Sequence, residues 1–148
     1  MIYDDTPTVI AVCVSEVKGT VKMPVPNITV KENYGIVGDA HAGEGHKQVS
    51  LLAEESVNKL RDEIPSLSAG DFAENILTHG ILLYEIPVGT KLQIGETILE
   101  VTQIGKKCHN DGCVIRQQIG DCVMPREGIF ASVIKGGIIK PGDQIELI

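Results

Sequence analysis

The sequence has no tryptophan and few other aromatic residues, which limits how its core can be built. Aromatic side chains make up only 3% of the 148 residues, whereas hydrophobic residues as a whole make up 43%. The core must therefore be formed by aliphatic side chains, and the many valines and isoleucines among them favour β-strands. This length is enough for one domain with a substantial core, so we expect a single domain over residues 1–148.

The sequence also lacks an excess of positive charge. Its formal net charge is −7 at pH 7, whereas binding to nucleic-acid phosphates needs clustered lysine and arginine. It has no apolar run near the roughly 20 residues that span a membrane, and no basic segment of the kind that begins a secretory signal. We therefore expect no nucleic-acid partner, no membrane partner, and a cytoplasmic location in which cysteines stay reduced.

Short runs of β-branched residues, separated by glycine and proline, predict a mainly β fold with a barrel-like sheet. The strands are expected at Thr8–Val14, Ile28–Val30, Gln48–Leu52, Ile76–Pro87, Lys91–Ile94, Thr97–Ile104, Gly128–Lys135 and Gln144–Ile148. Irregular loops are expected at Ser15–Pro26 and Leu67–Asn75. The clearest helix is Ala53–Glu63, in which Val57, Leu60 and Ile64 share one face. A second, short helix is expected at Cys113–Ile119.

Three of the four cysteines fall in one stretch, Gly105–Gly128, that also contains several cations. Two lysines precede Cys108 and His109 follows it. Nearby positive charge lowers the pKa of a thiol, and the thiolate is the form that attacks electrophiles and binds soft metals. Arg116 and Arg126 follow in the same stretch, and arginine offers forked donors to a phosphate or an oxyanion.

Three interpretations of these cysteines are open. In the first, Cys108 is a reactive thiolate or the single thiolate ligand of a metal. In the second, a structural zinc site is formed by Cys108, His109, Cys113 and Cys122, although their spacing lacks the usual pair of tight knuckles. In the third, Cys113 and Cys122 are inert packing residues. The fourth cysteine, Cys13, lies in an apolar run and is expected to be a core residue.

Two further sets of polar residues lie in the first third of the chain. Asp39, His41 and His46 occupy a glycine-rich stretch, where they form either a loosely spaced metal set or a loop whose side chains bond its own backbone. Lys18 and Lys22 lie in the loop before them. Each lysine either reaches a small anion or is simply solvated.

Six blocks of this sequence form a recognisable series: Gly38–Gly43, His46–Leu52, Gly70–Asn75, Pro87–Thr90, Gly105–His109 and Cys122–Phe130. Taken in order, they resemble the MOSC domain, which is named for the C-terminal domain of molybdenum cofactor sulfurases. The chain looks like the short, stand-alone prokaryotic form of the family. An arginine is common in the family where Lys47 stands, and lysine cannot make the same two-pronged contact.

The resemblance implies a β-rich, barrel-like fold that handles the molybdenum cofactor (molybdopterin) or the sulfur destined for it. Cys108 matches the cysteine that ligates molybdenum in larger members and is proposed to carry a persulfide in sulfurases, and His109 adjoins it as a candidate catalytic residue. The phosphate of the cofactor gives the cations a purpose. The candidate cofactor-binding residues are Lys18, Lys22, His41, Lys47, Arg116 and Arg126.

The function predicted in this way is that of a molybdenum-cofactor-binding or sulfur-carrier domain for molybdoenzyme maturation. Its expected partners are molybdoenzymes, cofactor-biosynthesis proteins and a cysteine desulfurase. Two alternatives are a molybdenum-dependent reductase of N-hydroxylated compounds and a zinc-stabilised structural module, so sulfur transfer and molybdenum-dependent redox chemistry are both open. The sequence has no aminotransferase-like portion, and we expect no pyridoxal phosphate on this chain.

Overall fold

A computed structural model describes residues 7–17, 21–43, 48–61, 64–105 and 127–148, and it is mainly β within them. Its strands are β1 (Thr8–Val14), β2 (Met23–Val25), β3 (Ile28–Lys31), β4 (Gly35–Ile36), β5 (Val49–Ala53), β6 (Ile76–His79), β7 (Lys91–Ile94), β8 (Thr97–Ile104), β9 (Ile129–Lys135), β10 (Gly137–Ile139) and β11 (Ile145–Leu147). Its helices are α1 (Glu54–Asn58) and the 3₁₀-helix η1 (Leu83–Glu85).

Eight of the strands form one sheet, in the order β11-β7-β8-β9-β5-β6-β1-β2. Its pairs are antiparallel except for the parallel pair of β5 and β6. The sheet curls so that β1 meets the chain just before β11: Thr8 bridges Gln144, and the Val9 N–H donates to the Asp143 carbonyl at 2.8 Å. This contact is a single bridge rather than a ladder. The barrel-like prediction is therefore confirmed as a rolled sheet that is not closed.

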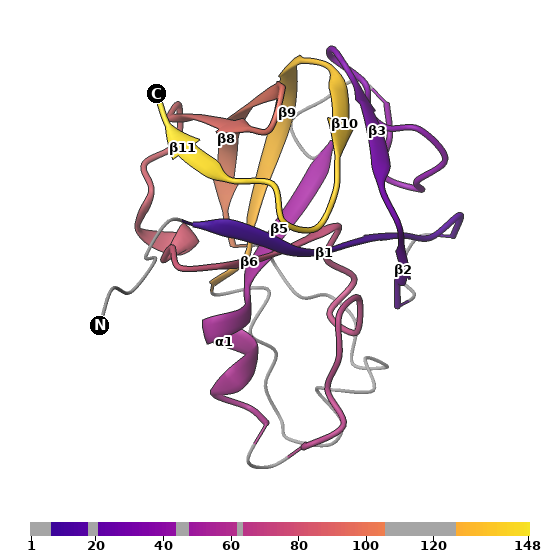
Figure 1. Ribbon diagram of the computed structural model, residues 1–148, viewed down its shortest axis with the longest axis vertical. Helices are drawn as coiled ribbons and strands as arrows, with labels where there is room; N and C mark the ends of the chain where they lie inside the picture. Colours follow the sequence, from indigo (N-terminus) through magenta and orange to yellow (C-terminus); the bar gives the residue numbers. More distant parts are fainter. Residues whose placement is uncertain (1–6, 18–20, 44–47, 62–63, 106–126) are drawn as a thin grey trace.

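A second sheet of three strands, β10-β3-β4, lies beside β9 (Figure 1). Strand β10 follows β9 directly along the chain, and the Asn33 N–H donates to the Val133 carbonyl of β9 at 2.9 Å. The buried Gln48 side chain strengthens this join, because its Oε1 accepts from the Val133 N–H at 3.0 Å and its Nε2 donates to Asn33 Oδ1 at 3.2 Å. The small sheet is thus fixed to the large one by backbone and side-chain hydrogen bonds.

The interior divides into two apolar clusters. The larger one lies between the strands and consists of aliphatic side chains alone, as the scarcity of aromatic residues predicts. The smaller one holds both phenylalanines, Phe72 and Phe130, together with Leu52, Val57 and Leu77. This second cluster packs α1 onto the end of the sheet from which α1 projects (Figure 1).

The predictions for Thr8–Val14, Lys91–Ile94 and Thr97–Ile104 are confirmed without change. The helix expected at Ala53–Glu63 is too long, because α1 ends at Asn58. The next bonds join Leu60 N–H to the Val57 carbonyl and Arg61 N–H to the Asn58 carbonyl, and these three-residue steps tighten the turn instead of extending the helix.

Two further predictions were wrong, one of a strand and one of a loop, and in both cases the local backbone gives the reason. The strand expected at Ile76–Pro87 ends at His79, because Gly80 has a φ of 89° and turns the chain towards η1. Conversely, Met23–Val25 is a strand although a loop was expected there. It is an edge strand of the sheet. Proline lacks an N–H, and Pro24 is tolerated there because the open side of an edge strand has no neighbouring strand to receive a hydrogen bond. The helix expected at Cys113–Ile119 lies outside the described residues.

The loop before β6 makes an unusually close approach to the chain before β2. Gly70 has a φ of 90°, its carbonyl accepts from the Lys22 N–H at 2.8 Å, and a Cβ placed on it would lie 1.9 Å from the Lys22 carbonyl oxygen. The Cys13 sulfur would be 3.5 Å from that Cβ. Only glycine fits at this position, so the loop fixes where the Lys22 backbone lies.

Gly70→Ala is therefore expected to lower the free energy of unfolding by roughly 3 kcal/mol or more, because two backbones would have to separate. Gly89→Ala is the matched control. Gly89 has a similar φ of 95° but open space around its Cβ position, and it should lose only about 1–2 kcal/mol from backbone strain. Urea denaturation of both variants checks this, and equal losses would contradict the close approach.

Candidate functional site

The described candidate site is a polar cluster that joins three segments of the chain. We call it the Asp39 cluster, and it consists of Ser15, Lys22, Asp39 and His41. Ser15 follows β1, Lys22 precedes β2, and the other two lie in the glycine-rich loop after β4. A backbone bond from the Ala40 N–H to the Ser15 carbonyl, at 2.7 Å, ties the first and last segments together.

Lys22 and Asp39 form an ion pair at the centre of the cluster. Lys22 Nζ lies 2.8 Å from Asp39 Oδ1, and the side chains are 1% and 0% exposed. Lys22 Nζ also lies 3.3 Å from Ser15 Oγ and 3.2 Å from His41 Nδ1. The ammonium has three N–H donors, so these three partners use its full capacity.

Asp39 is held ionised although it is cut off from water. Burial by itself raises the pKa of this carboxyl, but hydrogen bonds from Lys22 Nζ and from the backbone N–H groups of Ser15 and His41 outweigh it and hold the pKa well below its ordinary value. The backbone N–H groups of Ser15 and His41 donate to its two oxygens at 3.1 and 3.0 Å. The negative charge that balances Lys22 is therefore present throughout the physiological pH range.

Both expectations for Lys22 were wrong, because it neither faces solvent nor has a free donor for an anion. Its side chain is among the largest fully buried ones in the described part of the chain. No sequence signal indicated that Lys22 is buried, because its partner Asp39 lies 17 residues away and only the folded loops bring the two together. His41 is the member of the cluster that reaches the surface, with 26% of its side chain exposed.

The remaining candidate residues lie outside the described residues: Lys18, His46, Lys47, Cys108, His109, Cys113, Arg116, Cys122 and Arg126. Among the residues that the structure does describe, no group of three or more His, Cys, Asp or Glu side chains is arranged to hold a metal ion. Asp39 and His41 are thus not joined there by a third ligand.

Cys13 is confirmed as a core residue, and its chemistry follows from that position. It is the cysteine within the described ranges, and its side chain is completely buried. Burial raises the pKa of its thiol to about 12, and the negative charge of Glu74 adds to the effect. At neutral pH Cys13 is a protonated thiol without access to solvent, and it can neither attack a substrate nor ligate a metal.

Glu74 is a buried carboxyl that the sequence did not reveal as special. It has no exposed surface, its Oε2 accepts from the Gly70 N–H at 2.8 Å, and its Oε1 accepts from the Phe72 N–H at 3.1 Å. Burial raises the pKa of Glu74 to about 7 although these backbone bonds oppose the shift. The carboxyl thus fixes the loop that carries Gly70, which in turn holds Lys22.

Asn75, the last residue before β6, uses its side-chain amide to connect the strands on either side of β6. Its side-chain Oδ1 accepts from the Ser50 N–H at 3.0 Å, and its Nδ2 donates to the Cys13 carbonyl at 3.0 Å. β6 begins one residue later, between β5 and β1. The Asn75 amide therefore bridges these two strands at the level where β6 has not yet begun.

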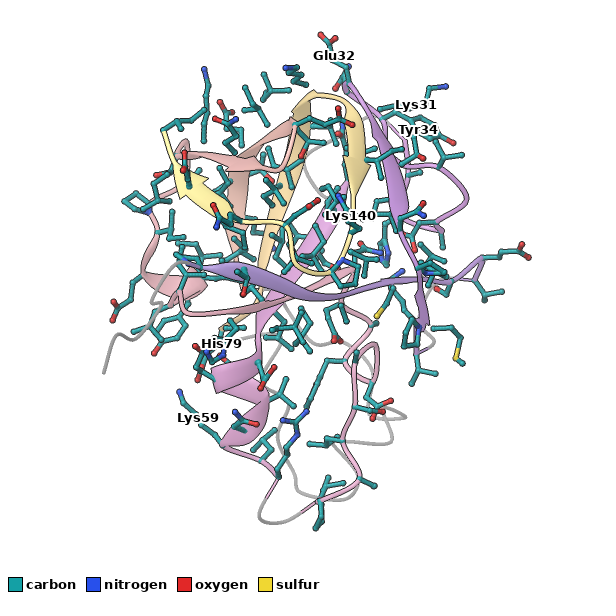
Figure 2. The ribbon with its side chains drawn as sticks, viewed as in Figure 1. Lys31, Glu32, Tyr34, Lys59, His79 and Lys140 are labelled. Carbon is teal, nitrogen blue, oxygen red and sulfur yellow. The ribbon has the colours of Figure 1, made fainter. Side chains whose placement is uncertain are left out.

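The described residues at the two ends of the stretch that carries Cys108 are fixed by hydrogen bonds. The Gly105 N–H donates to the Gly128 carbonyl at 2.6 Å, next to the pairing of β8 with β9. Glu127 then binds α1: its Oε1 accepts from Ser56 Oγ at 2.6 Å and from Lys59 Nζ at 2.9 Å. Lys59 lies on the outer end of this helix (Figure 2). Gly105 and Glu127, the described residues on either side of 106–126, therefore lie at the end of the sheet that α1 covers.

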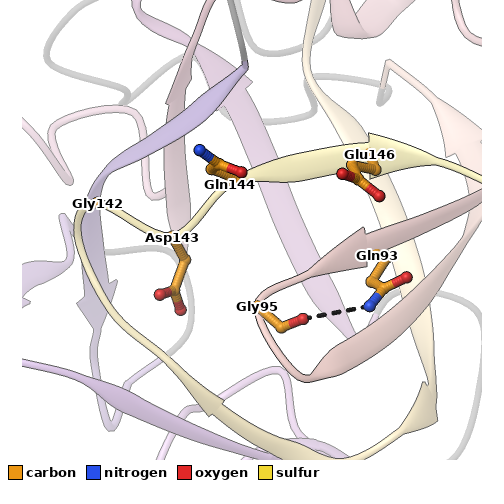
Figure 3. Close-up of a pocket in the computed structure, with 6 residues that line it drawn as sticks. All are labelled: Gln93, Gly95, Gly142, Asp143, Gln144 and Glu146. Carbon is orange, nitrogen blue, oxygen red and sulfur yellow. Dashed lines mark hydrogen bonds between the residues drawn. The ribbon is translucent and has the colours of Figure 1, made fainter.

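A polar pocket lies elsewhere, between the β7–β8 turn and the chain that leads into β11 (Figure 3). It has a volume of about 350 Å³ and is lined by Gln93, Gly95, Gly142, Asp143, Gln144 and Glu146. Asp143 is already engaged there, because its carboxylate accepts from the backbone N–H and the Nζ of Lys140 at 3.0 and 3.2 Å. None of the candidate residues named from the sequence lines this pocket.

The comparisons with known proteins identify the family. The MOSC domain model matches residues 38–146, which is most of the chain, and the chain belongs to the MOSC domain family. MOSC domains are associated in general with the molybdenum cofactor. No curated protein matches the chain. In the described ranges, no helix is long and apolar enough to cross a membrane.

Solved structures show the same fold. The YuaD protein from Bacillus subtilis is 18% identical, with a TM-score of 0.81 over 96% of this chain and 95% of that one. YiiM from Geobacillus stearothermophilus is 19% identical, with a TM-score of 0.73 over 96% of this chain and 75% of that one. YiiM from Escherichia coli is 20% identical, with a TM-score of 0.62 over 95% and 69%. At these identities the likeness concerns the fold alone.

The raised pKa of Glu74 makes a prediction for stability. The folded protein binds a proton there up to about pH 7, whereas the unfolded chain releases it near 4.5, the ordinary pKa of a glutamate. The stability that this proton contributes to the fold is therefore fully present below pH 4.5, and it is lost as the pH rises through 7. Glu74→Gln cannot titrate. Between pH 4.5 and 8 it should gain roughly 3 kcal/mol relative to wild type, measured by urea denaturation, and a constant difference would refute the assignment.

Proposed function

We propose that this chain is a molybdenum-cofactor-binding domain in which Cys108 is the working thiolate. In this role Cys108 ligates molybdenum or carries a persulfide for the maturation of molybdoenzymes. Family membership supports the link to the cofactor in general. The specific assignment to Cys108 is supported by its motif, by its neighbouring cations in the sequence, and by the chemistry of Cys13, which lies in the described part of the chain.

The observation that carries the proposal is the state of Cys13. A soft thiolate is required both for ligating molybdenum and for carrying sulfur. Cys13 cannot supply it, because it is buried and the pKa of its thiol is raised to about 12. The thiolate must therefore come from the stretch Gly105–Gly128, where Cys108 has lysines immediately before it and His109 after it.

The described structure also supports this stretch as the working part of the domain. Its ends are held by the Gly105–Gly128 backbone bond and by Glu127 on α1. The second apolar cluster then links α1, through Phe72, to the loop that holds Lys22 and the Asp39 cluster. One continuous framework therefore carries both the anchors of the Cys108 stretch and His41.

The chain's residues divide the binding of such a cofactor between them. Cys108 would supply the thiolate, and a phosphate would be met by the cations Lys18, Lys47, Arg116 and Arg126. His41 would add a donor from the Asp39 cluster. When bound, the cofactor supplies the metal chemistry that no described side chain provides.

Sulfur transfer is the reaction that this arrangement would carry out with partners. The Cys108 thiolate would attack the outer sulfur of a persulfide on a cysteine desulfurase, and the cysteine thiolate of the desulfurase would leave. Cys108 then carries the extra sulfur to a molybdoenzyme or to a cofactor-biosynthesis protein. His109 adjoins the reacting thiol in sequence and is the candidate for moving its proton.

Metal and pterin analysis of protein purified from a molybdenum-replete host tests the proposal. We expect molybdenum and pterin with the wild type, loss of molybdenum with Cys108→Ser, and retention with the matched variants Cys113→Ser and Cys122→Ser. Stoichiometric zinc without pterin, lost in Cys113→Ala, would show the zinc-stabilised module instead.

The persulfide role needs its own measurement. After incubation with a cysteine desulfurase and cysteine, mass spectrometry should find one added sulfur on Cys108 in the wild type and none in Cys108→Ser. Alkylation near neutral pH should also be faster at Cys108 than at Cys13, because a thiolate is the reactive form. An added sulfur on Cys122, or equal alkylation rates, would contradict the role of Cys108.

A further inference from the structure

The position of Lys22 determines how His41 can present itself to a ligand. An ammonium group has three donors and no acceptor. Lys22 Nζ faces His41 Nδ1 at 3.2 Å, Asp39 Oδ1 at 2.8 Å and Ser15 Oγ at 3.3 Å. For the contact with His41 to be a hydrogen bond, Nδ1 must offer its lone pair. A neutral imidazole with a lone pair on Nδ1 carries its proton on Nε2.

We propose that the buried Lys22–Asp39 pair is a positioning device that holds His41 as the Nε2–H tautomer, so that its outer nitrogen donates a hydrogen bond to an anionic oxygen of the ligand. This inference rests on the proposed function, because it assigns His41 a role towards the oxygen-rich part of such a ligand. It concerns a group that touches the ligand, His41, and a residue that acts through it, Lys22.

The arrangement differs from the one that prepares a histidine to bind a metal. A metal-ligating histidine donates its second N–H to a carboxylate or a carbonyl, which leaves the other nitrogen with a lone pair. Here the inner nitrogen faces an obligate donor. The nearest carboxylate oxygen, Asp39 Oδ2, lies 3.6 Å away and already accepts from the His41 backbone N–H at 3.0 Å. The outer nitrogen is thus a donor rather than a ligand or a base.

The device is rigid because the backbone of each member is fixed. Lys22 is held by its bond to the Gly70 carbonyl and by the close approach of that glycine. Asp39 is held by the N–H groups of Ser15 and His41. Its carboxylate stays ionised in the fold, which keeps a full negative charge beside the ammonium.

Exposure sets the direction in which the donor acts. Lys22 and Asp39 have almost no exposed surface, whereas 26% of the His41 side chain is exposed. Because Nδ1 faces the buried lysine, the ring edge that carries Nε2 points away from Lys22. A donor on a fixed ring is suited to a phosphate or another oxyanion, whose oxygens only accept.

The tautomer can be measured directly in wild-type protein labelled with ¹⁵N-histidine. Two-bond ¹H–¹⁵N correlation spectra above pH 8 should show His41 with its proton on Nε2 and a bare Nδ1; the His41→Gln spectrum assigns the signals. His79 is an internal control, because its Nδ1 lies 3.7 Å from Glu55 Oε2 on an exposed face beside α1 (Figure 2). A proton on Nδ1 of His41, or exchange between the two forms, would overturn the inference.

Lys22→Met tests whether the lysine sets the tautomer. Without the ammonium, Nδ1 can donate to Asp39 Oδ2, so the proton of His41 should move to Nδ1 while His79 is unchanged. Lys22→Arg keeps an obligate donor and should retain the wild-type form. If Lys22→Met does not fold, Lys22→Arg and the wild-type spectrum still decide, since a change of tautomer in Lys22→Arg would refute the device.

Titration with inorganic phosphate tests the donor role. The His41 Nε2–H signal should shift and saturate in wild type, His41→Gln should still bind because its amide also donates, and His41→Leu should bind at least tenfold more weakly. Equal binding by all three would overturn the donor role. None of these measurements needs molybdenum or Cys108, so their failure is distinguishable from a failure of the proposed function.

Discussion

A lysine and a carboxylate, both shielded from water, hold the loops of this domain together. Burying either charge alone is strongly unfavourable, and breaking such a pair leaves the other charge without compensation. The two ends of the β1–β2 connection and the loop after β4 therefore have to meet in one arrangement, which brings Lys22 and Asp39 within 2.8 Å. The surface histidine His41 inherits its place from this pair.

The loop that contains Gly70, Glu74 and Asn75 stabilises the Lys22–Asp39 pair by packing against the backbone of Lys22. Its glycine lies against the Lys22 backbone, its buried carboxyl binds the loop's own N–H groups, and its asparagine bridges β5 and β1. Phe72 of the same loop joins the second apolar cluster with Phe130. This loop is thus a structural block of the MOSC sequence, whereas the cysteine block is the one that carries the proposed chemistry.

The Gly70–Asn75 loop and the ends of the Cys108 stretch are far apart in the sequence, and α1 connects them in space. Glu127 binds Ser56 and Lys59 on the helix, and Val57 of the same helix packs in the cluster with Phe72. A short helix that would be unstable by itself therefore links the anchors of the Cys108 stretch to the loop under Lys22. Its tertiary contacts explain why it forms although its first residues have no side-chain cap.

Sequence alone determined the β-rich class, the positions of β1, β7 and β8, the burial of Cys13 and the family, because hydrophobic alternation, turn residues and motif blocks are local signals. It could not reveal the end of β6 at Gly80, the short α1, or the strand at Met23–Val25, since neighbouring strands and packing decided them. Only the tertiary structure showed that Lys22 is buried, because its partners Asp39 and His41 are remote in sequence. A charged side chain is buried only where an opposite charge pairs with it, and for Lys22 the fold alone brings that partner within reach.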